Sequence, residues 1–318
     1  MRTRLTERLG IRYPILQGGL AYLARAELAA AVSNAGGLGQ ITATTLPSPQ
    51  ALEAEVARLR SLTTAPFGVN FALGRRPIED LLAAALALRV PVISLTGGNP
   101  EPYVEQIRRA GAEWITLVGS VRAAVKAEAL GATAVVAVGY EAGGHLGRDD
   151  VTTLVLTRLV VEAVRIPVVA SGGIADGRGL LAALALGASG VEMGTRFVAT
   201  QESPAHPRYK AALVAGEATG TAVVERTLRS PGRMLASPWT EAIAIAEAAG
   251  DQERLLELIG GAANRRAALD GELDRGFVWA GQAMGLIRDV PSVAELIRRM
   301  VAEAEAAWQT LGQLWEGC

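Results

Sequence analysis

The sequence predicts an α/β fold, a (β/α)8 TIM barrel with a smaller, mostly helical inserted domain. Three observations support this prediction: short β-rich runs alternate with helical stretches, eight such units occur, and each run is almost continuously apolar. Parallel strands that are covered by helices on both faces lack a polar face, and eight of them close a barrel. A length of 318 residues fits one large barrel as well as two ordinary domains.

The expected strands follow one another at regular intervals, and most end in glycine or a polar residue. Helical stretches such as AELAAAVSNA and SVRAAVKAEALG fall between them. The strands are PILQGG (14–19), GLGQIT (37–42), PFGVNFA (66–72), VPVISLTG (90–97), EWITLVG (113–119), ATAVVAVG (132–139), PVVASGG (167–173) and GVEMGT (190–195).

An open, doubly wound sheet is the alternative architecture. It is disfavoured because glycine-rich ends recur on most units, whereas a dinucleotide-binding sheet concentrates its phosphate-binding glycines after the first strand. GGLG at 36–39 is no GxGxxG, and no GxxxxGK[ST] occurs in the chain. A nucleotide would therefore have to bind through other loops.

The regular alternation ends near residue 205, where scattered proline and glycine replace it. We expect residues 210–278 to form a smaller helical lid over the barrel mouth, and residues 1–209 and 279–318 to form the barrel. The segment PSVAELIRRMVAEAEAAWQTLGQLW is amphipathic and has a proline near its start, so it is expected to pack on the barrel as a final helix.

Composition and charge exclude several classes of partner. Lys and Arg number 31 against 32 Asp and Glu, so no basic field attracts nucleic acid or a membrane surface. MRTRLTERLG has no uninterrupted apolar run, and the apolar helices are interrupted by charges or glycines, so a cytoplasmic location is expected. Cys318 is the only cysteine, and no His/Asp/Glu spacing resembles a metal site, so neither an internal disulfide nor a metal is expected.

Polar residues and glycines gather at the predicted strand ends, which share one face of a barrel and form the usual place for its active site. Glycines after the seventh and eighth strands would expose backbone N–H groups to a phosphate, with the Thr195 hydroxyl beside them. A tight turn is the structural alternative for these glycines. The residues at the strand ends are Gln17, Gly18, Gly19, Asn70, Ser171, Gly172, Gly173, Met193, Gly194 and Thr195.

Six motifs occur in order along the chain: QGGL, AVSNAGGLG, PFGVN, EAGGHLG, ASGGIADGRG and MGTRF. Together they resemble the nitronate monooxygenase family, formerly called 2-nitropropane dioxygenases, over all eight strands. Flavin enoyl-acyl-carrier-protein reductases and NADH:quinone reductases share this fingerprint. The resemblance therefore indicates the family and leaves the reaction open.

The resemblance implies FMN as cofactor. Its phosphate would lie on Gly172, Gly173, Gly194 and Thr195, and its ring against Gln17, Gly18, Gly19 and Asn70, with Ser171 and Met193 completing the set. Glycines allow close backbone approach to a flat ring, and amide side chains can hydrogen-bond its polar edge.

His145 lies in the glycine-rich stretch GYEAGGHLG, and the resemblance makes it the catalytic residue. In a nitronate monooxygenase it would deprotonate a nitroalkane or orient the nitronate anion, and FMN would then pass an electron to O2. A loop histidine that caps a helix is the structural alternative. Glu141 could orient His145 or could be a solvated carboxylate, and His206 is expected to be structural.

Other functions remain open. An NAD(P)H:quinone reductase would need a second nucleotide pocket, which the sequence does not locate. An enoyl-acyl-carrier-protein reductase would be helped by a basic patch, which Arg226, Arg229 and Arg233 could supply unless they form a solvated face. A flavin-binding protein without turnover would have no need of His145. The sequence does not determine the substrate or the oligomeric state, for which a homodimer is one option.

Overall fold

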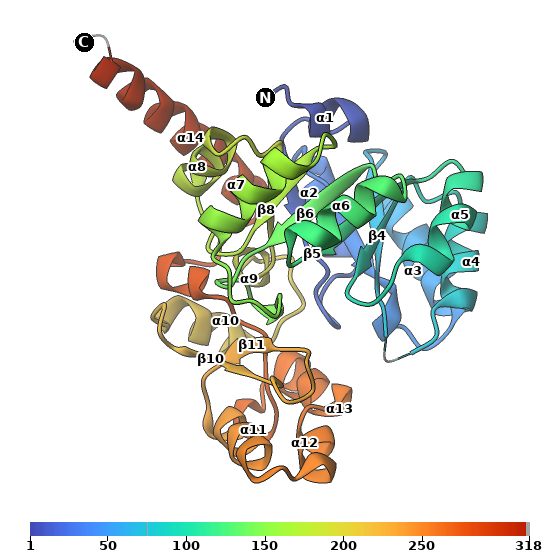
Figure 1. Cartoon of the computed structure of the whole chain (residues 1–318), viewed down its shortest axis with the longest axis vertical. Helices are drawn as coiled ribbons and strands as arrows, with labels where there is room; N and C mark the ends of the chain where they lie inside the picture. The colour runs from blue at the N-terminus through green and yellow to red at the C-terminus, as the bar shows by residue number, and fades with distance from the viewer. Residues whose placement is uncertain (75, 316–318) are drawn as a thin grey trace.

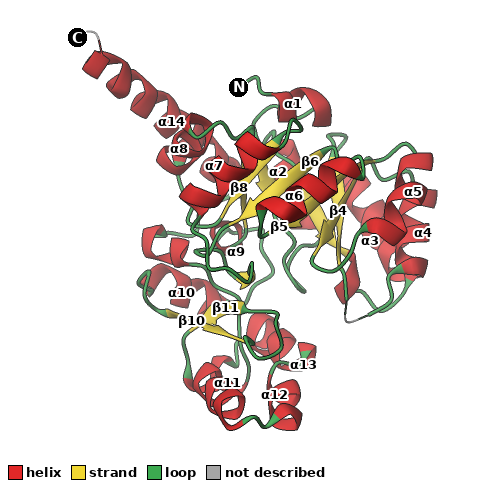
Figure 2. Ribbon diagram, viewed as in Figure 1, coloured by secondary structure: helices red, strands yellow, loops and turns green. Residues whose placement is uncertain are grey.

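The computed structural model describes residues 1–74 and 76–315, so Cys318 lies outside the described residues. Eight parallel strands form one sheet in the order β1-β9-β8-β6-β5-β4-β3-β2, and a bridge between Leu16 and Leu38 joins its two edges. This closure confirms the predicted barrel (Figures 1 and 2). The strands are β1 Ile15–Gln17, β2 Gly39–Thr42, β3 Phe67–Ala72, β4 Val92–Thr96, β5 Glu113–Val118, β6 Ala134–Val138, β8 Val168–Ser171 and β9 Gly190–Met193.

Each barrel strand lies within its predicted range, and all except β2 stop within two residues of a following glycine. The interior of the barrel is filled by apolar side chains of alternating strand positions, among them Leu16, Ile115 and Val136. Leu5 and Leu9 of α1 (Arg4–Leu9) belong to the same cluster, so this short helix closes the end of the barrel opposite the strand carboxyl ends.

The outer helices form where the sequence combines apolar periodicity with start signals. Ser48, Ser120 and Asp176 each accept a hydrogen bond from a backbone N–H of the first helical turn that follows. The helices between the strands are α2 Ala26–Asn34, α3 Pro49–Leu62, α4 Glu79–Ala87, α5 Glu101–Arg109, α6 Val121–Ala129, α7 Thr153–Ala163 and α8 Gly177–Ala185, and the short α9 Thr195–Val198 follows β9.

The region from 210 to 278 is largely helical and lies beside the barrel (Figure 1). It also contains two strands that the sequence analysis did not foresee, because they are short and pair with a strand far away in the sequence. β10 and β11 form an antiparallel sheet with β7, which carries His145. The elements are α10 Pro207–Ala215, β10 Thr221–Val224, β11 Gly232–Leu235, α11 Pro238–Ala249, α12 Gln252–Leu258, α13 Gly261–Arg265 and β7 Gly144–His145.

The last helix, α14 (Val293–Trp315), packs against α8 and α2 as expected. Its buried stripe includes Val293, Ile297 and Met300, which join the core between these helices. Beyond this contact the helix projects from the barrel (Figure 1), and Trp308 is exposed. Among the described residues, no helix is both long and apolar enough to span a membrane.

Candidate active site

A cavity of about 450 Å³ opens at the carboxyl ends of the barrel strands, between the barrel and the inserted region. This volume is in the range of small-molecule and cofactor sites. All but one of the sequence-predicted site residues line it. These are Gly18, Gly19, Asn70, His145, Ser171, Gly172, Gly173, Met193, Gly194 and Thr195.

Gln17 is the exception. Its side chain is fully buried in the barrel, where its Nε2 donates to the Gly18 carbonyl and its Oε1 accepts a hydrogen bond from the Gln40 backbone at 3.0 Å. The side chain of Gln40 donates in return to the Gln17 carbonyl at 2.8 Å. Gln17 thus supports the loop that lines the cavity, whereas its predicted contact with a cofactor ring remains a prediction.

Asn70 and Gly19 fit each other closely. The Asn70 amide donates to Ser94 Oγ at 3.1 Å and to Thr96 Oγ1 at 2.8 Å, which holds its Oδ1 toward Gly19. A Cβ on Gly19 would lie 2.2 Å from that Oδ1. Glycine is therefore required here if Asn70 is to keep its orientation at the cavity wall.

The turn after β8 has a backbone conformation that lets a bound group approach the main chain closely. Gly172 has φ 110° and Gly173 has φ 73°, conformations that L side chains rarely adopt. A Cβ on Gly173 would make an ordinary contact with Glu141 Cβ at 3.5 Å, and both residues line the cavity. Thr195 Oγ1 accepts a hydrogen bond from Gly281 N at 2.9 Å, and its O–H therefore remains available as a donor. These groups fit a phosphate.

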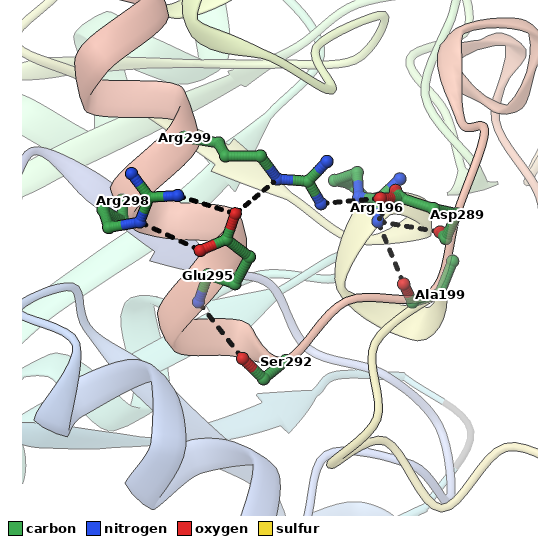
Figure 3. A network of polar contacts seen from close by, with 7 residues as sticks. All are labelled: Arg196, Ala199, Asp289, Ser292, Glu295, Arg298 and Arg299. Carbon is green, nitrogen blue, oxygen red and sulfur yellow. Dashed lines mark hydrogen bonds and ion pairs between the residues drawn. The ribbon is translucent and has the colours of Figure 1, made fainter.

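Arg196, which follows Thr195 in the MGTRF motif, does not line the cavity. Its buried guanidinium donates to the carbonyls of Ala199 and Asp289 at 3.1 and 3.0 Å. Asp289 also pairs with Arg299 of α14 at 2.8 Å, and the network continues to Glu295 (Figure 3). The arginine beside the candidate phosphate cradle is thus a brace between α9 and the segment that leads into α14.

His145 lies at the cavity wall on β7, with its side chain 44% exposed. Its ring contacts that of Trp279, with centroids 5.1 Å apart. The Nε2 atom lies 3.7 Å from Oε2 of Glu225, whose side chain is 1% exposed. This distance is too long for a hydrogen bond, so the contact between the two side chains is electrostatic.

The carboxylate beside His145 is therefore Glu225, and not Glu141. Glu141 accepts hydrogen bonds from Thr153 N at 2.8 Å and Thr153 Oγ1 at 2.9 Å, which orient it toward the start of α7. Glu225 follows β10 with φ 65°, and its backbone N–H donates to Glu247 at 3.1 Å. No sequence signal marked Glu225, because it lies in the irregular part of the chain.

Residues 279–282 were also missed as part of the site. Gly281 packs backbone to backbone on Gly143, since a Cβ on either glycine would approach the other's N to 2.6–2.7 Å. Gln282 N donates to the Glu141 carbonyl at 2.9 Å. This segment therefore ties the loop that carries His145 to the Thr195 side of the cavity.

Glu192 is a further residue that the sequence analysis did not single out. It lies on β9, lines the cavity and is 4% exposed. Burial raises the pKa of its carboxyl to about 7, and a hydrogen bond from the Ser171 side chain opposes that rise. A carboxyl group that exchanges its proton near neutral pH thus faces the cavity.

Two of the three arginines considered as a basic patch are engaged in other contacts. Arg233 is buried, stacks on the Tyr140 ring at 4.5 Å and donates to the Tyr140 carbonyl. Arg226 forms a paired contact with Asp150 at 3.0 and 3.2 Å. Within residues 1–74 and 76–315, no cluster of three or more His, Cys, Asp or Glu has the arrangement of a metal site.

The comparisons with known proteins agree on the family of this chain. A sequence profile described as nitronate monooxygenase matches residues 2–303. The nitronate monooxygenase of Pseudomonas aeruginosa is 36% identical, over 95% of this chain and 99% of its own. The (3aS,4S,5R,7aS)-5-hydroxy-7a-methyl-1-oxo-octahydro-1H-indene-4-carboxyl-CoA dehydrogenase of Mycobacterium tuberculosis is 32% identical over 99% of both chains.

Two solved structures extend this similarity to three dimensions. FabK from Thermotoga maritima has a TM-score of 0.94 and 41% identity, and 99% of each chain is covered. Nitroalkane oxidase from Streptomyces ansochromogenes has a TM-score of 0.82 and 29% identity, with 97% of this chain and 100% of that chain covered. The profile match and these relatives, each similar over nearly the whole chain, show that this protein is an oxidoreductase of the nitronate monooxygenase family.

Proposed function

We propose that this enzyme is an FMN-dependent nitronate monooxygenase that oxidises alkyl nitronates or nitroalkanes with O2. Enzymes of this family are generally flavin-dependent. The observation that carries the proposal is the placement of His145, with Glu225 behind it, on the wall of the cavity that the glycine-rich strand ends also line.

In this proposal the phosphate of FMN is held by Gly172, Gly173, Gly194 and Thr195. The single phosphate of FMN suits this one cradle, and no second nucleotide site is needed. A bound flavin would supply the electron transfer that the side chains of the cavity do not provide. Ser171 and Met193 line the wall between the cradle and the ring position, which Gly18, Gly19 and Asn70 define.

His145 is proposed to accept the proton from the carbon next to the nitro group of the substrate. Oε2 of the buried Glu225 lies 3.7 Å from Nε2 of the ring, so the carboxylate faces the charge that the ring would gain with the proton. Gly144, where an added Cβ would meet no atom within 4 Å, leaves room beside the imidazole. Trp279 packs on the ring and limits its rotation.

The second candidate is a reductase that uses NAD(P)H with a quinone or an enoyl thioester as acceptor. The apolar part of the cavity favours it, because that part continues past the ring position toward the inserted region. It is lined by Leu20, Leu23, Ile259, Ala268 and Phe277. An acyl chain could lie there, and the 41% identity to FabK fits this possibility. A third candidate, a flavin-binding protein without turnover, does not use the His145–Glu225 contact.

Anaerobic reduction of the bound flavin separates these candidates. The purified protein should be yellow and release FMN on denaturation; release of FAD, or no flavin after reconstitution, would contradict the site assignment. A nitronate should bleach the flavin without O2, and readmitted O2 should restore the colour. Rapid bleaching by NADH or NADPH, with no response to nitro compounds, would replace the monooxygenase by a reductase.

A further inference from the structure

The cavity contains a carboxyl group for which the proposed reaction has no role. Glu192 is almost completely buried, and its Oε2 has no hydrogen-bond partner within the described ranges 1–74 and 76–315. Buried polar atoms in folded proteins are nearly always paired. An unpaired carboxyl oxygen in the wall of a cavity therefore indicates that a bound molecule completes its hydrogen bonding.

The position of Glu192 relates it to the predicted ring site. A Cβ on Gly18 would lie 3.2 Å from the Cδ and Oε1 atoms of Glu192, so the carboxyl group is directly beneath that glycine. Ser171 is its partner in the register between β8 and β9 and hydrogen-bonds its carboxyl. Since Gly18 and Gly19 are predicted to contact the ring, the Glu192 carboxyl group lies next to the predicted ring site.

We propose that Glu192 contacts the flavin ring and takes up one proton when the ring is reduced. This inference rests on the proposed function, because it requires a flavin in the cavity. The reductant supplies two electrons, the ring gains these electrons with one proton, and the Glu192 carboxylate binds a second proton from water. No covalent bond of Glu192 other than the new O–H bond changes. A negative charge on the reduced ring would disfavour a neighbouring carboxylate, and protonation removes that repulsion.

The response of Glu192 depends on its burial and on the groups around it. Burial already brings the pKa of its carboxyl to about 7, so a further rise moves it through the neutral range. The strands on either side place the uncharged Leu16 and Ser171 opposite Glu192. The other titratable side chains on the cavity wall are Tyr22, Arg76, Glu141, His145 and Tyr209. Of these, Glu141 is bonded to Thr153, and the Tyr209 hydroxyl to the Trp279 carbonyl.

The test measures how many protons accompany reduction of the bound flavin. Flavin content is determined first in the wild type and in Glu192→Gln, which keeps the shape of the side chain. The midpoint potential is then followed from pH 6 to 8.5 with dithionite and redox dyes, and its slope gives the proton count. Between pH 8 and 8.5, where Glu192 of the oxidised protein is ionised, we expect about two protons per electron pair in the wild type and about one in Glu192→Gln.

Two control variants make the assignment specific. Glu141→Gln removes another carboxylate from the same cavity and should keep the wild-type proton count. His145→Ala should also keep it, and loss of the second proton in that variant alone would overturn the assignment to Glu192. An unchanged count in Glu192→Gln, or a single proton in the wild type, would overturn it as well. Absence of any bound flavin in the wild type would instead refute the proposed function on which the inference rests.

A second readout covers the case in which Glu192→Gln binds no flavin. The visible spectrum of the oxidised flavin in the wild type should change with a midpoint near pH 7, as the carboxyl beneath the ring ionises. Glu192→Asp shortens the side chain and should shift that midpoint or reduce the spectral change. A wild-type spectrum that is constant over this pH range would contradict contact between Glu192 and the ring.

Discussion

The two sides of the cavity are built in different ways. On the cradle side, Gly172, Gly173 and Thr195 follow two neighbouring parallel strands. The conformation of the main chain gives this part of the cavity wall its shape. On the opposite side, His145 reaches its position through pairing with β11, and its partner Glu225 comes from the inserted region. A local motif suffices for the first side, whereas the second requires segments far apart in the sequence to meet.

The two sides of the cavity should therefore respond differently to substitution. Changes on the cradle side should alter cofactor retention, and changes on the His145 side should alter turnover while cofactor is retained. Substitutions on each side of the cavity test this division.

The largest effect is expected for His145→Ala. Turnover of a neutral nitroalkane should fall by about 10²–10⁴-fold, the usual loss when a general base is removed. The pre-ionised nitronate needs no proton abstraction and should lose much less activity. FMN content should be unchanged. Steady-state rates on the two substrate forms provide the measurement, and equal losses on both would make His145 a binding residue.

Glu192→Gln should stabilise the protein without flavin at high pH. A carboxyl pKa raised from 4.5 to about 7 means that the folded state holds a proton that the unfolded state releases, so stability decreases as pH rises from about 4.5 to 7. The substitution should therefore raise the free energy of unfolding by about 3 kcal/mol at pH 8 and by much less at pH 5. Urea unfolding at both pH values measures this difference.

Glu141→Gln is the matched control for that experiment. Its carboxylate accepts two hydrogen bonds from Thr153, so the substitution should destabilise the protein at pH 8 by about 1–3 kcal/mol. A gain of stability in both variants would show that the effect of Glu192→Gln is a general response to lost negative charge.

Gly173→Ala should weaken FMN binding at least about tenfold, because its methyl group would enter the space that the phosphate needs. Gly131→Ala is the matched control: Gly131 has φ 85°, and a Cβ added there would have no atom within 4 Å, so it carries the same backbone strain far from the cavity. Titration of the two apoproteins with FMN gives the comparison. Equal affinities would place the phosphate elsewhere.

The smallest effect is expected for Glu225→Gln. Because the His145 ring is 44% exposed, solvent screens its attraction to the carboxylate, and the loss should be about 1 kcal/mol, or roughly fivefold in turnover of the neutral nitroalkane. FMN content should not change. A loss as large as that of His145→Ala would mean that Glu225 itself contacts the substrate.

Much of the barrel could be predicted from the sequence because its determinants are local. Continuous apolar runs, helical periodicity and glycines at strand ends are properties of short segments, and all eight strands were located by them. The cavity-lining glycines and Asn70 followed from the same argument, since the carboxyl ends of parallel strands meet on one face.

Other features of the site depend on contacts between segments that are far apart in the sequence, and the sequence pattern did not predict them. In the closed barrel, Gln17 bonds to Gln40 and does not line the cavity, whereas Glu192 faces the cavity. An apolar strand that is covered on both faces has no pattern that distinguishes inward from outward positions. The contact of His145 with Glu225 depends on pairing between β7 and β11, and such a long-range pairing leaves no periodic signal in either segment. The barrel and the glycines at its strand ends could therefore be read from local sequence patterns, whereas the carboxylates that face the cavity follow from contacts between distant segments.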